Sequence, residues 1–425
     1  MVLFGCTRGS TGDSSSSSPT SDTGSMTVTE SSSTMATTSP EDSSSTSGAV
    51  TTIDPTTSST SGDPDSSEST TGPAACGDGN AQPGEVCLDQ PTLLMMGAAP
   101  SDVLLVDLDG APALDLVACN RDDGNVALRL GDGTGGFGVR TTVAVGMLPL
   151  AIGAGDFDGD THTDIVASNS GSSDLTWLRG NSDGTLVSGG GFPTGMGPQD
   201  LVVSDFGDNG RADVVVSNGT DNNVGVLLAD PMPFAAIAPH ATGAGPRGVA
   251  LADASDDDVL DLLVANTTGD TVSLLLGNGS GGFGAAASFP VGDEPRAVGG
   301  GDVNGDGHGD AVTVNGAGGL SRLLGNGLGS FGAALPFGTA VGPSDLLLVD
   351  LDIDGDLDLA VVSTGDMTLR VMTNDGAGTF TELVQLPTGA SPIAVTAGDI
   401  NEDGLPDLVV ANQGAATVSI VLSQA

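Results

Sequence analysis

A nine-residue acidic segment recurs seven times in this sequence, and its side chains suit a divalent cation. The segments begin at Asp107, Asp156, Asp205, Asp253, Asp302, Asp350 and Asp399, at steps of 49, 49, 48, 49, 48 and 49 residues. In a tight loop alternate side chains point inward, so oxygens at positions 1, 3 and 5 converge, and a carbonyl near position 7 and a carboxylate at position 9 complete the shell. Calcium binds about 6–8 such oxygens at about 2.3–2.6 Å. The segments therefore predict calcium sites.

Four of the segments carry the whole pattern. Their expected ligands are Asp156, Asp158, Asp160 and Asp164; Asp302, Asn304, Asp306 and Asp310; Asp350, Asp352, Asp354 and Asp358; and Asp399, Asn401, Asp403 and Asp407. Two weaker copies offer three carboxylates each, namely Asp107, Asp109 and Asp115, and Asp253, Asp257 and Asp261. The pattern is interrupted by Ala111 at position 5 and by Gly207 and Ser255 at position 3.

Crowded carboxylates repel one another, so the folded loops are disfavoured without a cation. Magnesium is less suited than calcium because it demands octahedral geometry and keeps several of its waters. The alternative interpretation is a solvated acidic turn without a metal.

The overall charge is strongly negative. The 425 residues include 55 acids and 10 bases, all of them Arg, for a net charge of −45. Such a surface repels nucleic acids, so we expect no nucleic-acid partner. About half of the acids fall in the seven repeated segments, which favours cation binding over solubility alone. No run of 18 apolar residues is present, so the sequence predicts no membrane-spanning helix.

Four short apolar segments make up each repeat, most clearly in residues 295–342. They are separated by turns rich in Gly, Asn and Asp, which is typical of β-strands, and four antiparallel strands per repeat predict a propeller blade. A Pro stands seven residues before every acidic segment, at a position that suits a connection between blades. In five repeats a Phe follows the last turn, and we expect it to pack between adjacent sheets (Phe137, Phe234, Phe283, Phe331 and Phe380).

The two ends of the array are complementary. The last repeat stops at TVSIVLSQA, without a fourth strand, whereas residues 91–100 (PTLLMMGAAP) match the fourth strand of other repeats. We therefore expect an all-β, seven-bladed β-propeller in which the N-terminal strand completes the last blade and removes the open edges. A right-handed β-solenoid is the alternative, although it would not need a strand supplied from the other end.

The repeats resemble the FG-GAP or VCBS family. The acidic pattern D-x-[D/N]-x-D-G-x-x-D, the Phe-Gly pairs at 137–138, 283–284 and 331–332, and the Gly and Pro residues before each segment carry this resemblance over residues 91–425. The family builds the propellers of integrin α chains and of many bacterial surface proteins. The resemblance implies calcium ligands at positions 1, 3, 5 and 9 of each matching segment.

Three shorter regions precede the array. Residues 1–6 (MVLFGC) resemble the end of a bacterial lipoprotein signal, which implies lipidation of Cys6. Residues 7–75 are rich in Ser, Thr, Gly and Pro, so we expect a disordered linker. Residues 76–90 resemble a short Cys-rich module of bacterial surface proteins, and we expect a disulfide between Cys76 and Cys87 and hence an oxidising compartment.

No catalytic arrangement stands out. The chain lacks Tyr and Lys, which excludes Schiff-base and Tyr general-acid chemistry. His162 and His308 stand at position 7 of two acidic segments and His240 in a connection, so their spacing builds no common site. Cys119 and Trp177 are expected in the core.

We therefore predict a calcium-stabilised, non-enzymatic binding or adhesion module that acts outside the cytoplasm. It would be secreted or anchored at the outer surface through a lipid on Cys6, and would bind a protein or glycan of the cell surface. One alternative is a polysaccharide lyase or hydrolase, which would need acids or His at the mouth of the central channel. The other alternative is a structural surface protein without a specific ligand.

Overall fold

The computed structural model describes residues 86–230, 234 and 238–424. The expected signal remnant with Cys6, the linker at 7–75 and Cys76 lie outside these residues, so lipidation, the linker and the Cys76–Cys87 disulfide stay predictions. The described residues form 28 strands and no helix, and so contain no helix able to cross a bilayer.

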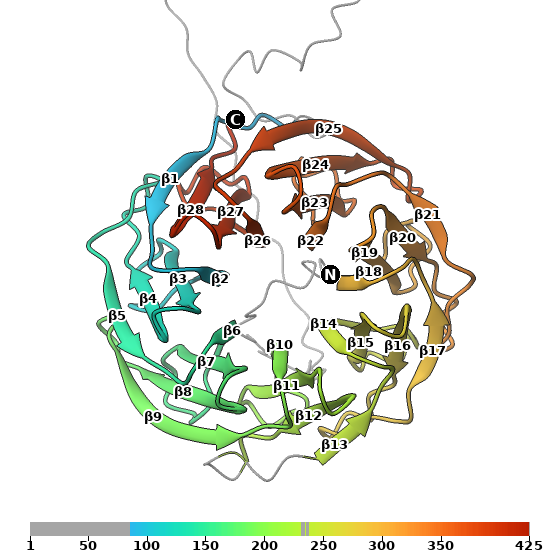
Figure 1. Ribbon diagram of the computed structural model, residues 1–425, viewed down its shortest axis with the longest axis horizontal. Coiled ribbons are helices and arrows are strands. Elements are labelled where there is room, and N and C mark those ends of the chain that lie inside the picture. Colours follow the sequence, from blue (N-terminus) through green and yellow to red (C-terminus); the bar gives the residue numbers. More distant parts are fainter. Residues whose placement is uncertain (1–85, 231–233, 235–237, 425) are drawn as a thin grey trace, which may run out of the picture. The chain divides into compact units, whose positions relative to one another are not determined.

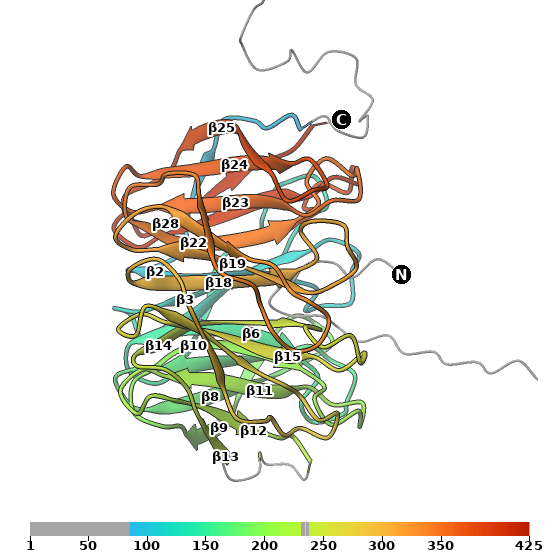
Figure 2. The same ribbon diagram turned by 90° about the vertical axis from the view of Figure 1, so that its right-hand side faces the viewer.

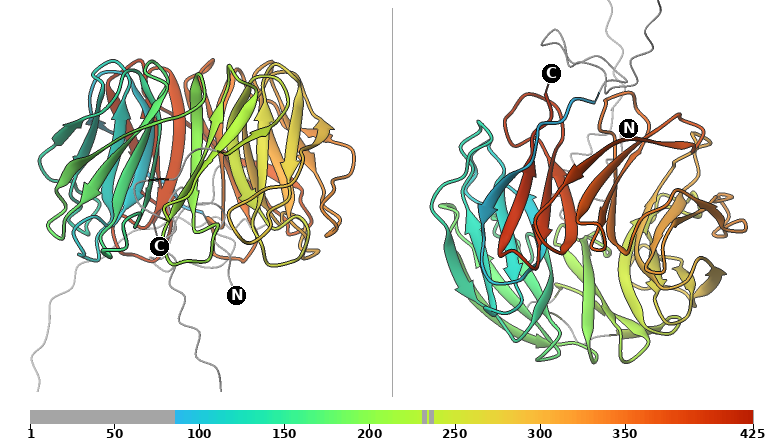
Figure 3. Two further views of the ribbon diagram at one scale, coloured as in Figure 1. Left: turned by 90° about the horizontal axis from the view of Figure 1, so that it is seen from below. Right: turned by 45° about the horizontal axis from the view of Figure 1, so that its top comes forward.

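Seven four-stranded antiparallel sheets surround a central axis (Figure 1). In each sheet the strands follow one another outward from the axis, and the side views show them running between two rims where the connections lie (Figures 2 and 3). The predicted all-β fold, a seven-bladed β-propeller, is confirmed.

The innermost strand of every blade begins at the predicted Pro. These strands are β2 Pro100–Val106, β6 Pro149–Gly155, β10 Pro198–Ser204, β14 Pro246–Ala252, β18 Pro295–Gly301, β22 Pro343–Val349 and β26 Pro392–Gly398. The second strands are fully buried and begin at position 9 of the acidic segment. They are β3 Asp115–Asn120, β7 Asp164–Asn169, β11 Asp213–Asn218, β15 Asp261–Asn266, β19 Asp310–Asn315, β23 Asp358–Ser363 and β27 Asp407–Asn412.

The two outer strands of each blade complete the sheet. The third strands are β4 Asn125–Arg129, β8 Asp174–Gly180, β12 Asn223–Leu227, β16 Thr271–Leu275, β20 Leu320–Leu323, β24 Thr368–Asn374 and β28 Thr417–Val421. The fourth strands are β5 Thr141–Ala144, β9 Leu186–Pro193, β13 Ala238–Ala241, β17 Ala287–Pro290, β21 Leu335–Phe337, β25 Phe380–Pro387 and β1 Thr92–Met95. In the fourth strands whose burial is described, most residues are exposed, as expected at an outer edge.

The core lies between neighbouring blades. One cluster joins Val202 and Val215 of the third blade to Leu251 and Leu262 of the fourth. Phe283 belongs to this cluster, and its ring meets that of Phe206 edge-to-face at 5.5 Å. The repeated Phe therefore packs between adjacent sheets, as predicted, because inner strands covered on both faces need an apolar filler.

The seventh sheet combines both ends of the array. Its strand order is β1-β28-β27-β26, with Thr92 opposite Ile420 and Met95 opposite Thr417. The backbone N–H of Asp89 also donates to the carbonyl of Leu422 at 2.8 Å. Because β2 continues from β1 and lies beside β26, the ring is closed (Figure 1).

Cys119 and Trp177 lie in the core, as expected. Cys119 is fully buried on β3. Trp177 lies on β8 and is 9% exposed.

Candidate metal centres

All seven acidic segments join the innermost strand of a blade to its second strand. Asp156, for example, follows the last residue of β6, and Asp164 is the first residue of β7. Equivalent connections in a ring of like blades lie at the same rim. The seven segments therefore lie together on one rim of the propeller. The Pro residues that begin the innermost strands lie on the other rim.

The Asp at position 9 fixes the base of each loop. Asp164 is fully buried, and its two oxygens accept hydrogen bonds from the backbone N–H groups of Phe157 at 3.2 Å and Gly180 at 2.7 Å. The other six Asp residues at this position accept from the equivalent pairs: Leu108 and Gly131, Phe206 and Ala229, Ala254 and Gly277, Val303 and Gly325, Leu351 and Asn374, and Ile400 and Ser423. Each Asp thus ties position 2 of the loop and the end of the third strand to the second strand.

This structural role was missed from the sequence, which assigned position 9 to the metal alone. The bonds are also present at Asp213 and Asp261, whose loops lack a ligand at position 3. A signal was available, because position 9 is Asp in all seven segments whereas positions 3 and 5 vary.

The Asp at position 1 shapes the turn. Asp156 accepts from the backbone N–H groups of Gly159 at 2.7 Å and Thr161 at 2.8 Å, so the loop wraps around this carboxylate. Both donors have left-handed backbone angles, with φ values of 81° and 70°. In the first segment Pro112 stands where Thr161 stands in the second, and it cannot make this bond because Pro has no N–H.

Three loops bring three carboxylates together. In each of the sets Asp107, Asp109 and Asp115; Asp156, Asp158 and Asp164; and Asp350, Asp352 and Asp358, one oxygen from each residue lies within 4.8 Å of the others. Two oxygens on opposite sides of a calcium ion would be about 5 Å apart. The three sets therefore fit calcium, and Asp107 gathers with its neighbours even though Ala111 interrupts its segment.

Several of these carboxylates are harder to ionise than a free Asp side chain. Burial raises the pKa of Asp164 to about 6 and that of Asp358 to about 7. The pKa of Asp352 is raised to about 6 by burial and by the negative charge of Asp354. Arg179 approaches the second cluster, with its Nε atom 3.7 Å from Asp158 Oδ2. A divalent cation would supply the positive charge that such a site lacks.

Comparison with known families agrees with this arrangement. A family profile described as FG-GAP-like repeat matches residues 107–167, 156–216, 302–361 and 350–410. Each match begins at the first Asp of one acidic segment and runs past the end of the next, and together the matches cover just over half of the chain. The chain belongs to the FG-GAP-like repeat family.

Solved structures share the fold of this FG-GAP repeat protein at low sequence identity. The BP39L lectin from Burkholderia pseudomallei is 18% identical, with a TM-score of 0.59 over 78% of this chain and 99% of the lectin. BBS1N, solved in complex with ARL6DN, is 13% identical with a TM-score of 0.56 over 79% and 96% of the two chains. Hydrazine synthase from Kuenenia stuttgartiensis is 14% identical with a TM-score of 0.54 over 76% and 95%. The comparison with curated proteins finds no significant match.

Two FG-GAP repeats place Asn at position 3. Asn304 Oδ1 accepts from the backbone N–H of Asp306 at 3.0 Å, and Asn401 Oδ1 accepts from that of Asp403 at 3.1 Å. Asp158 makes the same bond in the second repeat, at 3.2 Å to Asp160. The amide oxygens thus occupy the place of the carboxylate, so these repeats keep this hydrogen bond of the second repeat with one charge fewer at positions 1, 3, 5 and 9.

The fourth FG-GAP repeat departs further. Asp253, Asp257 and Asp261 are not among the three-carboxylate groups of the described residues, and Ser255 holds position 3. Asp256 of this loop instead contacts the next repeat, where its Oδ2 atom lies 2.6 Å from Nδ1 of His308.

The three His residues lie apart, as predicted. His162 contacts Asp160 of its own loop at 3.1 Å, and His308 contacts Asp256. His240 lies on β13, where its ring meets that of Phe283 edge-to-face at 5.9 Å and burial lowers its pKa.

Proposed function

We propose that this FG-GAP repeat protein is a calcium-stabilised binding or adhesion module that presents one face of the propeller to a protein or glycan. The observation that carries the proposal is the presence of three Asp clusters, in each of which one oxygen from each residue lies within 4.8 Å of the others. Asp156, Asp158 and Asp160 with Asp164 would hold calcium in the second repeat, and the matching residues would hold it in the others. The ion would supply structural stability by neutralising the loop.

The proposed location is outside the cytoplasm. Extracellular modules bind calcium with a Kd of about 10⁻⁴–10⁻³ M, so they are occupied only where calcium is abundant. The expected lipidation of Cys6 and the expected disulfide of Cys76 belong to the same hypothesis. A lipid on Cys6 would be the point of attachment to a membrane.

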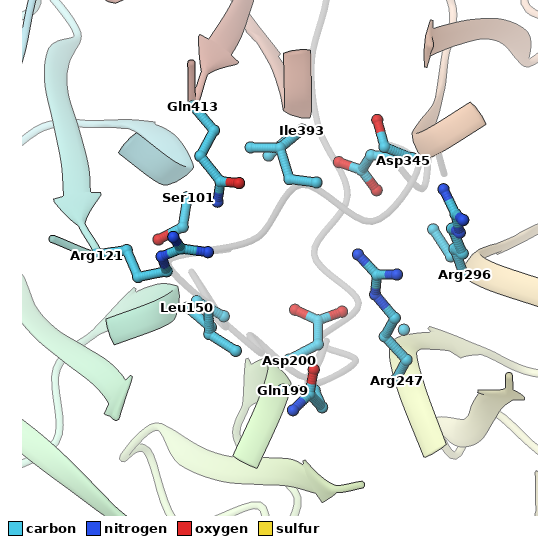
Figure 4. Close-up of a pocket in the computed structure, with 15 residues that line it drawn as sticks. Ser101, Arg121, Leu150, Gln199, Asp200, Arg247, Arg296, Asp345, Ile393 and Gln413 are labelled. Atoms are coloured by element: carbon cyan, nitrogen blue, oxygen red, sulfur yellow. The ribbon is translucent and has the colours of Figure 1, made fainter. Parts of the chain in front are cut away.

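A binding role is favoured over an enzyme. The lectin from Burkholderia pseudomallei supports glycan binding on this fold, although the likeness extends to the fold alone. Asp200 and Asp345 do lie at an end of the central channel, where the enzyme alternative requires acids (Figure 4). However, they accept backbone N–H groups of the following blades, from Val249 at 3.1 Å and Val395 at 3.0 Å, so each joins two innermost strands.

The proposal is tested by applying the full chain to a glycan array and to an envelope extract, in calcium and in EDTA. A module of this kind should retain a defined glycan or surface protein in calcium and release it in EDTA. If the protein retains no ligand in calcium, a structural surface protein without a specific ligand is the better interpretation. If it releases product from a polysaccharide, it is an enzyme and the proposal is wrong.

A further inference from the structure

The central channel ends in a cavity of about 370 Å³ on the rim away from the acidic segments. All seven innermost strands contribute their second or third residue to the lining, so the cavity lies on the axis of the ring (Figure 4). Its volume falls in the range of about 300–1,000 Å³ that is usual for small-molecule sites.

Arg side chains gather around this cavity. Arg121, Arg247 and Arg296 line it, although the whole chain has only 10 bases against 55 acids. Arg247 and Arg296 directly follow the Pro residues that begin β14 and β18, and Figure 4 shows Arg121 across the channel from them. Three of the few bases at one cavity make it a local positive site on an acidic protein, which favours an anionic ligand.

Arg247 differs from the other two in its contacts, because Arg121 and Arg296 each have an ion pair with a neighbouring carboxylate. Within the described residues, its guanidinium group has no hydrogen bond or ion pair. Burial and the neighbouring charge of Arg296 lower the pKa of Arg247, and the charges of Asp345 and Asp200 oppose this shift. Arg296 contacts the carbonyl of Pro343 at 3.4 Å and the exposed carboxylate of Glu294 at 3.5 Å. A guanidinium group has five N–H donors in a planar fork that fits a carboxylate, so several donors of Arg247 and Arg296 have no partner among the described residues.

The other lining groups restrict the anion. Asp200 and Asp345 place two negative charges beside the three positive ones, and a dianion such as phosphate would be repelled by them. The amides of Gln199 and Gln413 can donate to and accept from hydroxyl groups. Leu150 adds an apolar wall. The site thus suits a ligand that carries one negative charge and several hydroxyl groups.

We propose that this cavity binds a monoanionic, hydroxyl-bearing carboxylate of the hexuronate class, either as a free sugar or as a terminal residue of a glycan. Arg247 and Arg296 hold the carboxylate, and Gln199 and Gln413 contact hydroxyl groups. The inference rests on the proposed binding function, for which it names a site and a ligand class.

Calorimetric titration of the full chain in calcium tests the inference. Glucuronate should bind, whereas glucuronamide, which has the same shape without the charge, and inorganic phosphate should not. Arg247→Gln should weaken glucuronate binding at least about tenfold, because a hydrogen-bonded charge contact is worth about 1.5–3 kcal/mol. Arg322→Gln on β20, outside the cavity, is the matched control and should leave the affinity unchanged.

Arg296→Gln provides a second variant in case Arg247→Gln does not fold, and it should weaken binding in the same direction. A glucuronate-terminated oligosaccharide compared with free glucuronate separates the two sources, since tighter binding of the oligosaccharide indicates a glycan end and equal binding a free sugar. Equal binding of glucuronate and glucuronamide, no binding of either, or unchanged affinity in both cavity variants would overturn the inference. The wider binding function would survive that result if the glycan array or envelope extract still yielded a ligand.

Discussion

The indole N–H of Trp177 donates a hydrogen bond to Oδ2 of Asp164 over 3.1 Å. Asp164 is the buried position 9 of the second acidic segment, and its carboxylate belongs to the cluster with Asp156 and Asp158. Trp177 is the only Trp, and the chain has no Tyr. The intrinsic fluorescence of the protein therefore reports on one candidate calcium site.

Calcium titration should change the emission of Trp177, because a cation bound by Asp164 alters the charge at the acceptor of the indole N–H. Asp158→Asn should shift this titration to higher calcium, since it removes one of the gathered charges. Asp352→Asn makes the same change in the sixth repeat and should leave the Trp177 titration where it was. If both substitutions shift the calcium titration equally, Trp177 emission does not report on calcium binding in the second repeat.

Asp213 should stabilise the fold whether or not calcium is present. Its loop has Gly207 at position 3, yet its carboxylate accepts from Phe206 at 3.1 Å and Ala229 at 2.7 Å. Asp213→Asn turns an NH₂ group toward one of these buried donors, so we expect a loss of about 1–3 kcal/mol in the free energy of unfolding. Urea unfolding in calcium and in EDTA should show the same loss.

Asp208→Asn provides the control for this prediction. Asp208 is exposed on the same loop, and the substitution should change stability by less than about 0.5 kcal/mol. If the effect of Asp213→Asn appeared in calcium and vanished in EDTA, position 9 would act through the metal and its structural role would be wrong.

The metal-free protein should become more stable as the pH falls from about 7.5 to about 5. Burial raises the pKa of Asp310 to about 6 and that of Asp358 to about 7, above the ordinary value of 3.8. The folded state therefore takes up protons in this window that the unfolded state does not, and their contribution to stability is lost as the pH rises through these values. Thermal unfolding in EDTA across the window measures this dependence.

Calcium should reverse this dependence on pH. The ion competes with protons for the same carboxylates, so the calcium concentration at half-saturation should rise as the pH falls. A metal-free protein that loses stability as the pH falls from 7 to 5 would contradict the raised pKa values of Asp310 and Asp358.

The sequence predicted the frame of the molecule closely because each repeat marks its own boundaries. The Pro before each acidic segment begins an innermost strand, and the Asp at position 9 begins the next strand. These positions are set by local residue types, and the same types recur in all seven repeats. The seven blades follow from the count of segments.

Other features of the candidate sites depend on contacts between residues that are distant in the sequence, and the local pattern does not show these contacts. The approach of Asp107, Asp109 and Asp115 despite Ala111 follows from burial of Asp115 at the base of its loop. Arg247 and Arg296 are 49 residues apart and meet only because the ring brings neighbouring innermost strands together. Comparing the residues that follow each Pro would have revealed this pair.

The most direct test of the central claim is the melting temperature of the full chain in calcium, in EDTA and in magnesium. A site with a Kd of about 10⁻⁴ M contributes about 2.7 kcal/mol at about 10 mM calcium, since the ion binds only the folded loop. We predict that EDTA lowers the melting temperature and that calcium restores it, whereas magnesium restores little. An identical melting temperature in EDTA and calcium would contradict the account.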